Sequence, residues 1–114
     1  WLGFLFLDHN NYKKAGKSMP LMNNIITLEK LNNYFFVTGE ALAKAKKALN
    51  GSQQAEEFLD MAQRYYDDAL HFQKKGEIVN AFACLNYAHG WLDAGARLEL
   101  FEVKDSRLFT VDDD

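Results

Sequence analysis

The stretch that most constrains the fold is "AFACLNYAHGWLDAGARLELF", residues 81–101, because as a helix it is apolar almost all the way round. With about 100° between successive residues, one line of side chains consists of Ile78, Phe82, Leu85, His89, Leu92 and Ala96. A second line, about 150° around the helix, consists of Cys84, Tyr87, Trp91, Ala94, Leu98 and Phe101. Small residues lie between the two lines at Ala81, Ala88 and Gly95. A helix with so wide an apolar surface must be covered from more than one side.

This helix also contains two glycines, Gly90 and Gly95, each less favourable in a helix than alanine by about 0.5–1 kcal/mol. We interpret them as positions where a neighbouring backbone approaches closely. Two other helices are too few to cover the whole apolar arc, so a further surface is needed. The candidates are residues 1–12, the segment "DSRLFTV" and a second copy of the chain.

An apolar patch that stays uncovered on such a helix is rarely tolerated in a monomer. The residues that we expect to form an interface are Tyr87, Trp91, Leu98 and Phe101. Their partner would be a second copy of the protein, which makes a homo-oligomer, or an unidentified protein.

Two more amphipathic helices precede this one, with apolar residues at alternating steps of three and four. The first stripe is Leu28, Leu31, Phe35, Thr38, Leu42, Ala45 and Leu49. The second is Ala55, Phe58, Ala62, Tyr65, Ala69 and Phe72. Gly51 and Ser52 end one helix and cap the next, and Gly76 leaves a connection so short that the flanking helices must be antiparallel neighbours.

These patterns predict an all-α, up-and-down three-helix bundle. The expected division is an N-terminal extension over 1–22, a bundle over 23–101 with helices at about 25–49, 53–75 and 77–101, and a C-terminal tail over 102–114 that packs on the bundle. Because "MPLM" places Met19 and Met22 just before the first helix, the native start is expected at one of them, upstream of which residues 1–18 would be an extension.

Composition narrows the class of protein. The chain has 114 residues and one cysteine, Cys84, so it forms a single domain without an intrachain disulfide. A net charge of −3 disfavours general nucleic-acid binding without excluding it. The apolar opening "WLGFLFLD" lacks a preceding basic region, and no run reaches the roughly 18–20 apolar residues of a membrane span. We therefore expect no membrane partner.

Polar side chains interrupt the third helix at Asn86, His89, Asp93 and Arg97. One interpretation is structural: Asp93 and Arg97, four residues apart with the acid first, form an ion pair that sets helix register or an interface. The alternative is a polar patch that binds a small anion or a metal. His89 with Asp93, or Asp67 with His71, offers only two ligands per helix, whereas hydrolytic zinc needs three protein ligands. The sequence thus predicts no metal and no cofactor.

A second alternative concerns RNA. Arg64 and His71 lie seven residues apart, on one helix face, and this Arg-x(4–6)-His spacing resembles that of the higher eukaryote–prokaryote nucleotide-binding family. That resemblance implies histidine-assisted RNA cleavage across a dimer interface. The basic run that includes Lys44 and Lys47 would hold phosphates, although Asp67 and Asp68 beside the motif would repel them.

Motifs typical of catalysis are missing from the sequence: it has no glycine-rich phosphate loop, no Cys-x-x-Cys and no Ser/His/Asp arrangement. Cys84 lies on an apolar line, which is typical of a small buried residue rather than of a nucleophile. We therefore expect a non-enzymatic module for self-association or protein docking, with the RNA site and the polar patch as the two alternatives.

The run "AEEFLDMAQRYYDDALHFQKKGEIVNAFACLNYAHGWLDAGARLELF", followed by "SRLFTV", resembles the archaeal family known as domain of unknown function 357. The similarity covers about residues 28–111 and is most specific in "NYAHGWLDAGARL". It implies a compact three-helix bundle, a cytoplasmic archaeal source and no established activity or catalytic residues. Glu99 departs from the pattern, because a glycine is expected there, as in "ARLGLF".

Overall fold

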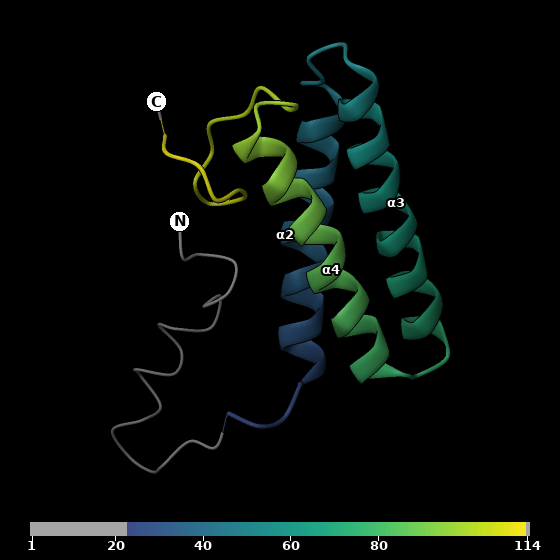
Figure 1. Ribbon diagram of the computed structural model, residues 1–114. Helices are drawn as coiled ribbons and strands as arrows, with labels where there is room; N and C mark the ends of the chain where they lie inside the picture. Colours follow the sequence, from purple (N-terminus) through teal and green to yellow (C-terminus); the bar gives the residue numbers. More distant parts are fainter. Residues whose placement is uncertain (1–22, 114) are drawn as a thin grey trace.

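The computed structural model describes residues 23–113, which form an all-α bundle of three helices (Figure 1). The helices are α2 (Leu28–Lys46), α3 (Gln53–Lys74) and α4 (Ile78–Arg97). They run up, down and up, with the most extensive contact between α3 and α4 and a further contact between α4 and α2. The predicted fold class, an up-and-down three-helix bundle, is confirmed.

Capping residues decide where the helices begin. Thr27 accepts a hydrogen bond from the Lys30 N–H at 3.1 Å, so α2 begins at Leu28 rather than at residue 25. Ser52 caps α3 in the same way, accepting from the Ala55 N–H at 3.1 Å. Leu28 itself is 63% exposed, because it stands at the open end of the bundle.

The end of α4 differs from the predicted helix over 77–101. α4 ends at Arg97, and Glu99 adopts φ 60°, the left-handed conformation that ends many helices. The Leu100 N–H then donates to the Gly95 carbonyl at 2.9 Å, which turns the chain back toward the bundle. A Cβ built on Gly95 would overlap the Phe101 ring, so this glycine is required for Phe101 to pack against α4.

The core consists of two clusters along the bundle. One lies among the first halves of α2 and α4 and the second half of α3, around Leu31, Tyr34 and Leu85. The other lies at the opposite end, around Leu42 and Leu92 and the C-terminal residues Phe101, Leu108 and Phe109. Val37 and Tyr66 contact both clusters, which makes the core continuous.

The residues after α4, 98–113, are called the C-terminal segment below. Its large side chains are buried: Phe101 is 1%, Leu108 3% and Phe109 2% exposed. Its first residues pair with the α2–α3 connection, where the Asn50 N–H donates to the Leu100 carbonyl at 2.9 Å and the Glu102 N–H to the Ala48 carbonyl at 2.8 Å. The segment therefore covers one end of the bundle as an additional layer (Figure 1).

Two other expectations concern the ends of the chain. The N-terminal extension over 1–22 and the proposed start at Met19 or Met22 lie outside the described residues, 23–113.

Within residues 23–113, none of the helices combines the length and the apolar character needed to cross a membrane.

Candidate functional site

The polar patch on α4 contacts the C-terminal segment. His89 is 1% exposed and lies between two hydrogen-bond partners. Its Nδ1 is 3.0 Å from the Thr38 hydroxyl of α2, and its Nε2 is 2.6 Å from the Leu108 carbonyl. One imidazole ring thus joins α2, α4 and the C-terminal segment.

These partners determine the form of the histidine. A carbonyl only accepts, so Nε2 carries the hydrogen and donates to Leu108, and Nδ1 accepts from the Thr38 hydroxyl. Burial lowers the pKa of His89 to about 4, although the hydrogen bond to the Leu108 carbonyl acts in the opposite direction. His89 is therefore neutral at physiological pH.

Asp93 and Arg97 contact the same segment one turn further along. The Asp93 carboxylate accepts from the Thr110 N–H at 3.0 Å, and Arg97 Nη1 donates to the Thr110 carbonyl at 3.5 Å. Burial raises the pKa of Asp93 to about 6, while the hydrogen bond from Thr110 opposes the rise. Three of the four predicted patch residues therefore bind this chain's own C-terminal segment.

The fourth residue of the patch, Asn86, bonds within its own helix. Its side-chain amide donates to the Phe82 carbonyl at 2.9 Å. The structure brings His89 within 3.7 Å of Asp93. Across residues 23–113, no group of three or more His, Cys, Asp or Glu side chains is arranged to hold a metal ion.

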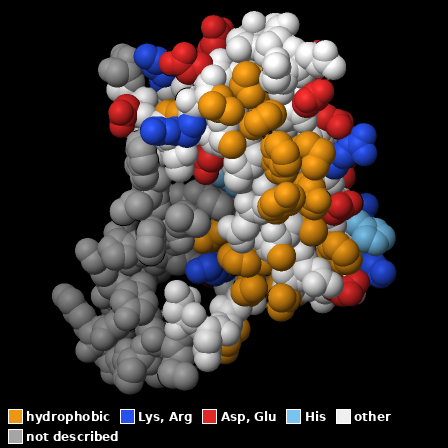
Figure 2. Space-filling model, viewed as in Figure 1, with side chains coloured by type: hydrophobic (Ala, Val, Ile, Leu, Met, Phe, Trp, Pro, Cys, Tyr) orange, Lys and Arg blue, Asp and Glu red, His pale blue; other side chains and the backbone are white. Residues whose placement is uncertain are grey.

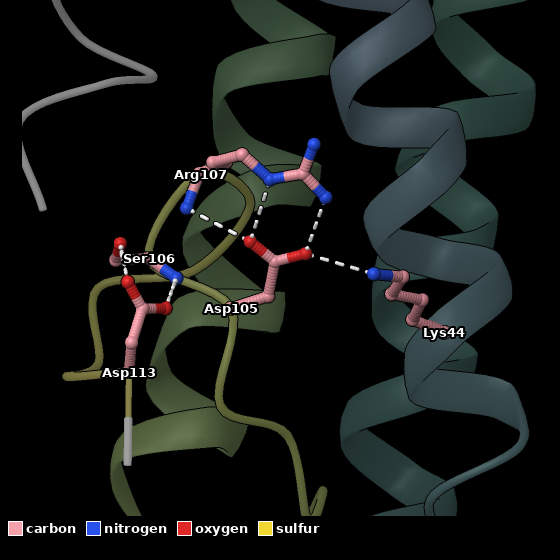
Figure 3. A network of polar contacts seen from close by, with 5 residues as sticks. All are labelled: Lys44, Asp105, Ser106, Arg107 and Asp113. Carbon is pink, nitrogen blue, oxygen red and sulfur yellow. Dashed lines mark hydrogen bonds and ion pairs between the residues drawn. The ribbon is translucent and has the colours of Figure 1, made fainter.

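A second polar contact attaches the C-terminal segment to α2 (Figure 3). The Asp105 carboxylate is 2.8 Å from Lys44 Nζ of α2 and 2.8 Å from Arg107 Nη2. The hydrogen bonds from Arg107 and then Lys44 hold the pKa of Asp105 well below its usual range. Lys44, which the RNA hypothesis assigns to phosphate binding, is thus paired with a carboxylate.

Aromatic side chains follow the boundary between α3 and α4. We call Phe58, Tyr65, Tyr87 and Trp91 the aromatic row. Edge-to-face contacts link Phe58 with Trp91 at 5.1 Å, Tyr87 with Trp91 at 6.3 Å and Tyr65 with Tyr87 at 4.4 Å between ring centroids. Trp91 is half-buried, and its buried indole Nε1 has no hydrogen-bond partner within residues 23–113.

The predicted interface residues are divided by the fold. Tyr87 on the outer face of α4 is 53% exposed, and Leu98, the residue that directly follows the helix on the same side, is 63% exposed. Phe101, which the helical pattern places beside them, is instead buried at the end of the bundle, because the chain leaves the helix at Glu99. Figure 2 shows hydrophobic side chains gathered as a band along α4 and its boundary with α3.

Arg64 and His71 of the RNA hypothesis are both exposed on α3. The Arg64 guanidinium is 2.8 Å from the Asp60 carboxylate, one turn away. The His71 ring packs against Phe72, with 5.5 Å between centroids. Lys47 is exposed at the end of α2. Arg64 and His71 thus each contact a neighbouring residue of α3, and RNA binding at this position stays a prediction.

Cys84 is partly buried on α4, where burial and then the nearby Asp68 carboxylate raise the pKa of its thiol. A raised pKa reduces the thiolate fraction at neutral pH, so the environment does not activate this cysteine as a nucleophile.

An open hollow of about 800 Å³ lies beside the end of α4. Its lining includes Arg97 and Lys104 as well as Glu99, Glu102 and Asp112. Positively and negatively charged side chains thus both line the hollow, and this mixture favours neither an anionic nor a cationic ligand.

Two contributors to these contacts were not identified from sequence. The periodic pattern places Thr38 in an apolar stripe, and its polarity at a buried position is the available signal that it bonds a buried partner. Asp105 bonds Lys44 across 61 positions of sequence, and no local pattern indicates that pair.

Comparison with known proteins adds the family. The family model described as protein of unknown function (DUF357) matches residues 33–101, well over half of the chain. No curated protein and no solved structure matches the chain. The matched residues include most of α2 and the whole of α3 and α4. The chain therefore belongs to the DUF357 family, as its resemblance to domain of unknown function 357 predicted.

Proposed function

We propose that this protein is a non-enzymatic helical module of the cytoplasm that works by binding a protein surface, and that its first partner is a second copy of itself. The observation that carries the proposal is the outer face of α4, where Tyr87 is 53% and Leu98 63% exposed beside the half-buried Trp91. Exposed apolar patches of this kind mark interaction sites on folded proteins.

The polar residues of α4 support this proposal because they bind the chain's own C-terminal segment. His89 and Asp93 bind the C-terminal segment through Leu108 and Thr110. Their side chains therefore hold the fold together and are not directed at a free ligand. Between Ala83 and Ala94, the residues that α4 exposes to solvent are uncharged and mostly apolar.

The test is the oligomeric state of the whole chain, measured by light scattering and sedimentation over a range of concentrations. We expect a concentration-dependent dimer. Tyr87→Asp and Leu98→Asp, each placing an unpaired charge in the contact, should raise the dimer Kd by about a hundredfold or more.

The matched control is Phe36→Asp. Phe36 is 69% exposed and lies two residues from the buried Thr38, hence on the opposite side of α2 from the core. It should leave association unchanged. A wild-type chain that stays monomeric at every concentration and binds no protein would contradict the proposal, as would equal effects of the Phe36 and Tyr87 variants.

A further inference from the structure

The outer face of α4 is complementary to itself in size: when the helix is reversed, large side chains fall where small ones stood. Its central exposed residues are Ala83, Tyr87, Gly90, Ala94 and Leu98, with the half-buried Trp91 at the edge toward α3 and the exposed Val79 and Arg97 at the other edge. The steps of four and three keep these residues on one side of the helix. Large and small side chains alternate along it.

Resting on the proposed self-association, we infer that two copies of the protein pair through α4 in antiparallel fashion, with a two-fold axis beside Gly90 and Trp91. Ala83 then lies opposite the partner's Leu98, and Tyr87 opposite the partner's Ala94. Gly90 lies opposite the partner's Trp91. Every register position sets a small residue against a large one, which is the arrangement that fills space between facing helices.

A parallel pairing of the same faces lacks this property. It sets Tyr87 against the partner's Tyr87, and Gly90 against the partner's Gly90. Two bulky rings would then hold the helices apart, while the small residues would leave voids between them. Two-fold interfaces use the same patch on both subunits, and the antiparallel register makes this patch complementary to itself.

Gly90 is the residue that the single chain leaves unexplained. A Cβ at Gly95 would overlap Phe101 and one at Gly39 would contact the Tyr66 hydroxyl, whereas a Cβ at Gly90 meets nothing within 4 Å. Glycine is unfavourable within a helix, and among residues 23–113 no contact requires it at this exposed position. Close approach of the partner's Trp91 requires it.

The charges of α4 favour an apolar occupant of this face. Over Ile78–Arg97 the helix has one carboxylate, Asp93, and one cationic side chain, Arg97, and both bond Thr110 of the C-terminal segment. His89 is buried and is neutral in its hydrogen-bonded form. The exposed residues from Ala83 to Ala94 are all uncharged, and antiparallel pairing places the two Arg97 side chains at opposite ends of the contact, which avoids like-charge repulsion at its centre.

Cysteine cross-linking of the full-length chain tests the register. In a Cys84→Ala background, one sample carries Ala83→Cys, a second carries Leu98→Cys, and a third mixes the two. Mild oxidation should produce a disulfide dimer in the mixture and little in either chain alone, because only residues 83 and 98 face each other. Tyr87→Cys mixed with Ala94→Cys should behave in the same way. Ala43→Cys, exposed on α2, is the control and should not cross-link.

Gly90→Gln provides a second readout that does not depend on disulfide geometry. Glutamine favours the helix more than glycine does, so the thermal stability of the monomer should be kept or increased. Its side chain should nevertheless raise the dimer Kd by about tenfold or more, since it separates the two helices.

The outcomes separate the two proposals. Dimers whose chains cross-link alone at positions 83 and 98 would show parallel pairing and overturn the register. Dimers by light scattering with no cross-link at either pair, and with Gly90→Gln unaffected, would place the interface elsewhere and leave self-association standing. A chain that is monomeric throughout would overturn both.

Discussion

Glu99 adopts a backbone conformation that L-amino acids disfavour. Its φ of 60° lies in the left-handed region, where the Cβ approaches the neighbouring carbonyl oxygen. The conformation persists because the turn is supported on both sides: the Leu100 N–H donates to Gly95, and the Asn50 amide donates to the Glu99 carbonyl at 3.2 Å. The departure from the expected glycine therefore stores strain at the end of α4.

Glu99→Gly should relieve that strain. Because glycine has no Cβ, we expect the free energy of unfolding to rise by about 1 kcal/mol, measured by denaturant titration at a concentration where the chain is monomeric. Glu99→Ala retains the Cβ and is the matched control. Equal stabilisation by both variants would show that loss of the carboxylate, and not the backbone, is responsible.

At the scale of elements, α4 has three sides with different surroundings. One side packs against α2 and α3 through residues such as Leu85 and Leu92, which are fully buried. A second side holds the C-terminal segment through His89 and Asp93. The third side is the exposed face around Tyr87. This division explains why the helix is apolar nearly all round and why its few polar residues are grouped.

The attachment of the C-terminal segment depends on pH through two opposing groups. Because the pKa of His89 is lowered from 6.5 to about 4, its contribution to stability is present above pH 6.5 and is lost as the pH falls toward 4. Because the pKa of Asp93 is raised from 3.8 to about 6, its contribution is present below pH 3.8 and is lost as the pH rises through 6. Between these values the two changes largely cancel.

Asp93→Asn removes one of the opposing groups while its amide oxygen still accepts from Thr110. Between pH 7 and pH 4 the variant should lose on the order of 2 kcal/mol more unfolding free energy than the wild type. Denaturant titrations across this range measure the difference, with Asp67→Asn on the exposed side of α3 as the control. A variant curve parallel to that of the wild type would contradict the opposing roles of the two groups.

At the scale of the molecule, the three helices and the C-terminal segment bury one continuous core. Large apolar side chains stay exposed on α2, at Leu28 and Phe36, and along α4, where Tyr87 belongs to the hydrophobic band of Figure 2. Association through that surface stabilises the folded chain by mass action, because the unfolded chain has no such surface.

The thermal midpoint should therefore depend on protein concentration. We expect the wild-type Tm to rise by several degrees for a roughly hundredfold increase in concentration. Tyr87→Asp should show a midpoint that is independent of concentration. Calorimetry or circular dichroism at matched scan rates measures both, and a constant wild-type midpoint would argue against a dimer in this range.

The sequence by itself determined the helices, their order and their antiparallel connections. These depend on local properties: the steps of three and four in each stripe, the cap at Ser52, and the glycines at Gly51 and Gly76, whose φ values are positive. The family also followed from sequence, because the α3–α4 hairpin carries specific runs of residues.

Only the tertiary structure decided what the side chains of α4 contact. Periodicity gives the direction of a side chain around its helix but not the identity of its neighbour, so His89 and Asp93 could equally have faced a ligand or this chain's own backbone. Phe101 does not lie on the predicted stripe, because α4 ends at Arg97 and the left-handed conformation of Glu99 redirects the chain. The partners that settle these roles, Thr38 and Leu108 for His89, lie far away in sequence, and folding alone brings them together.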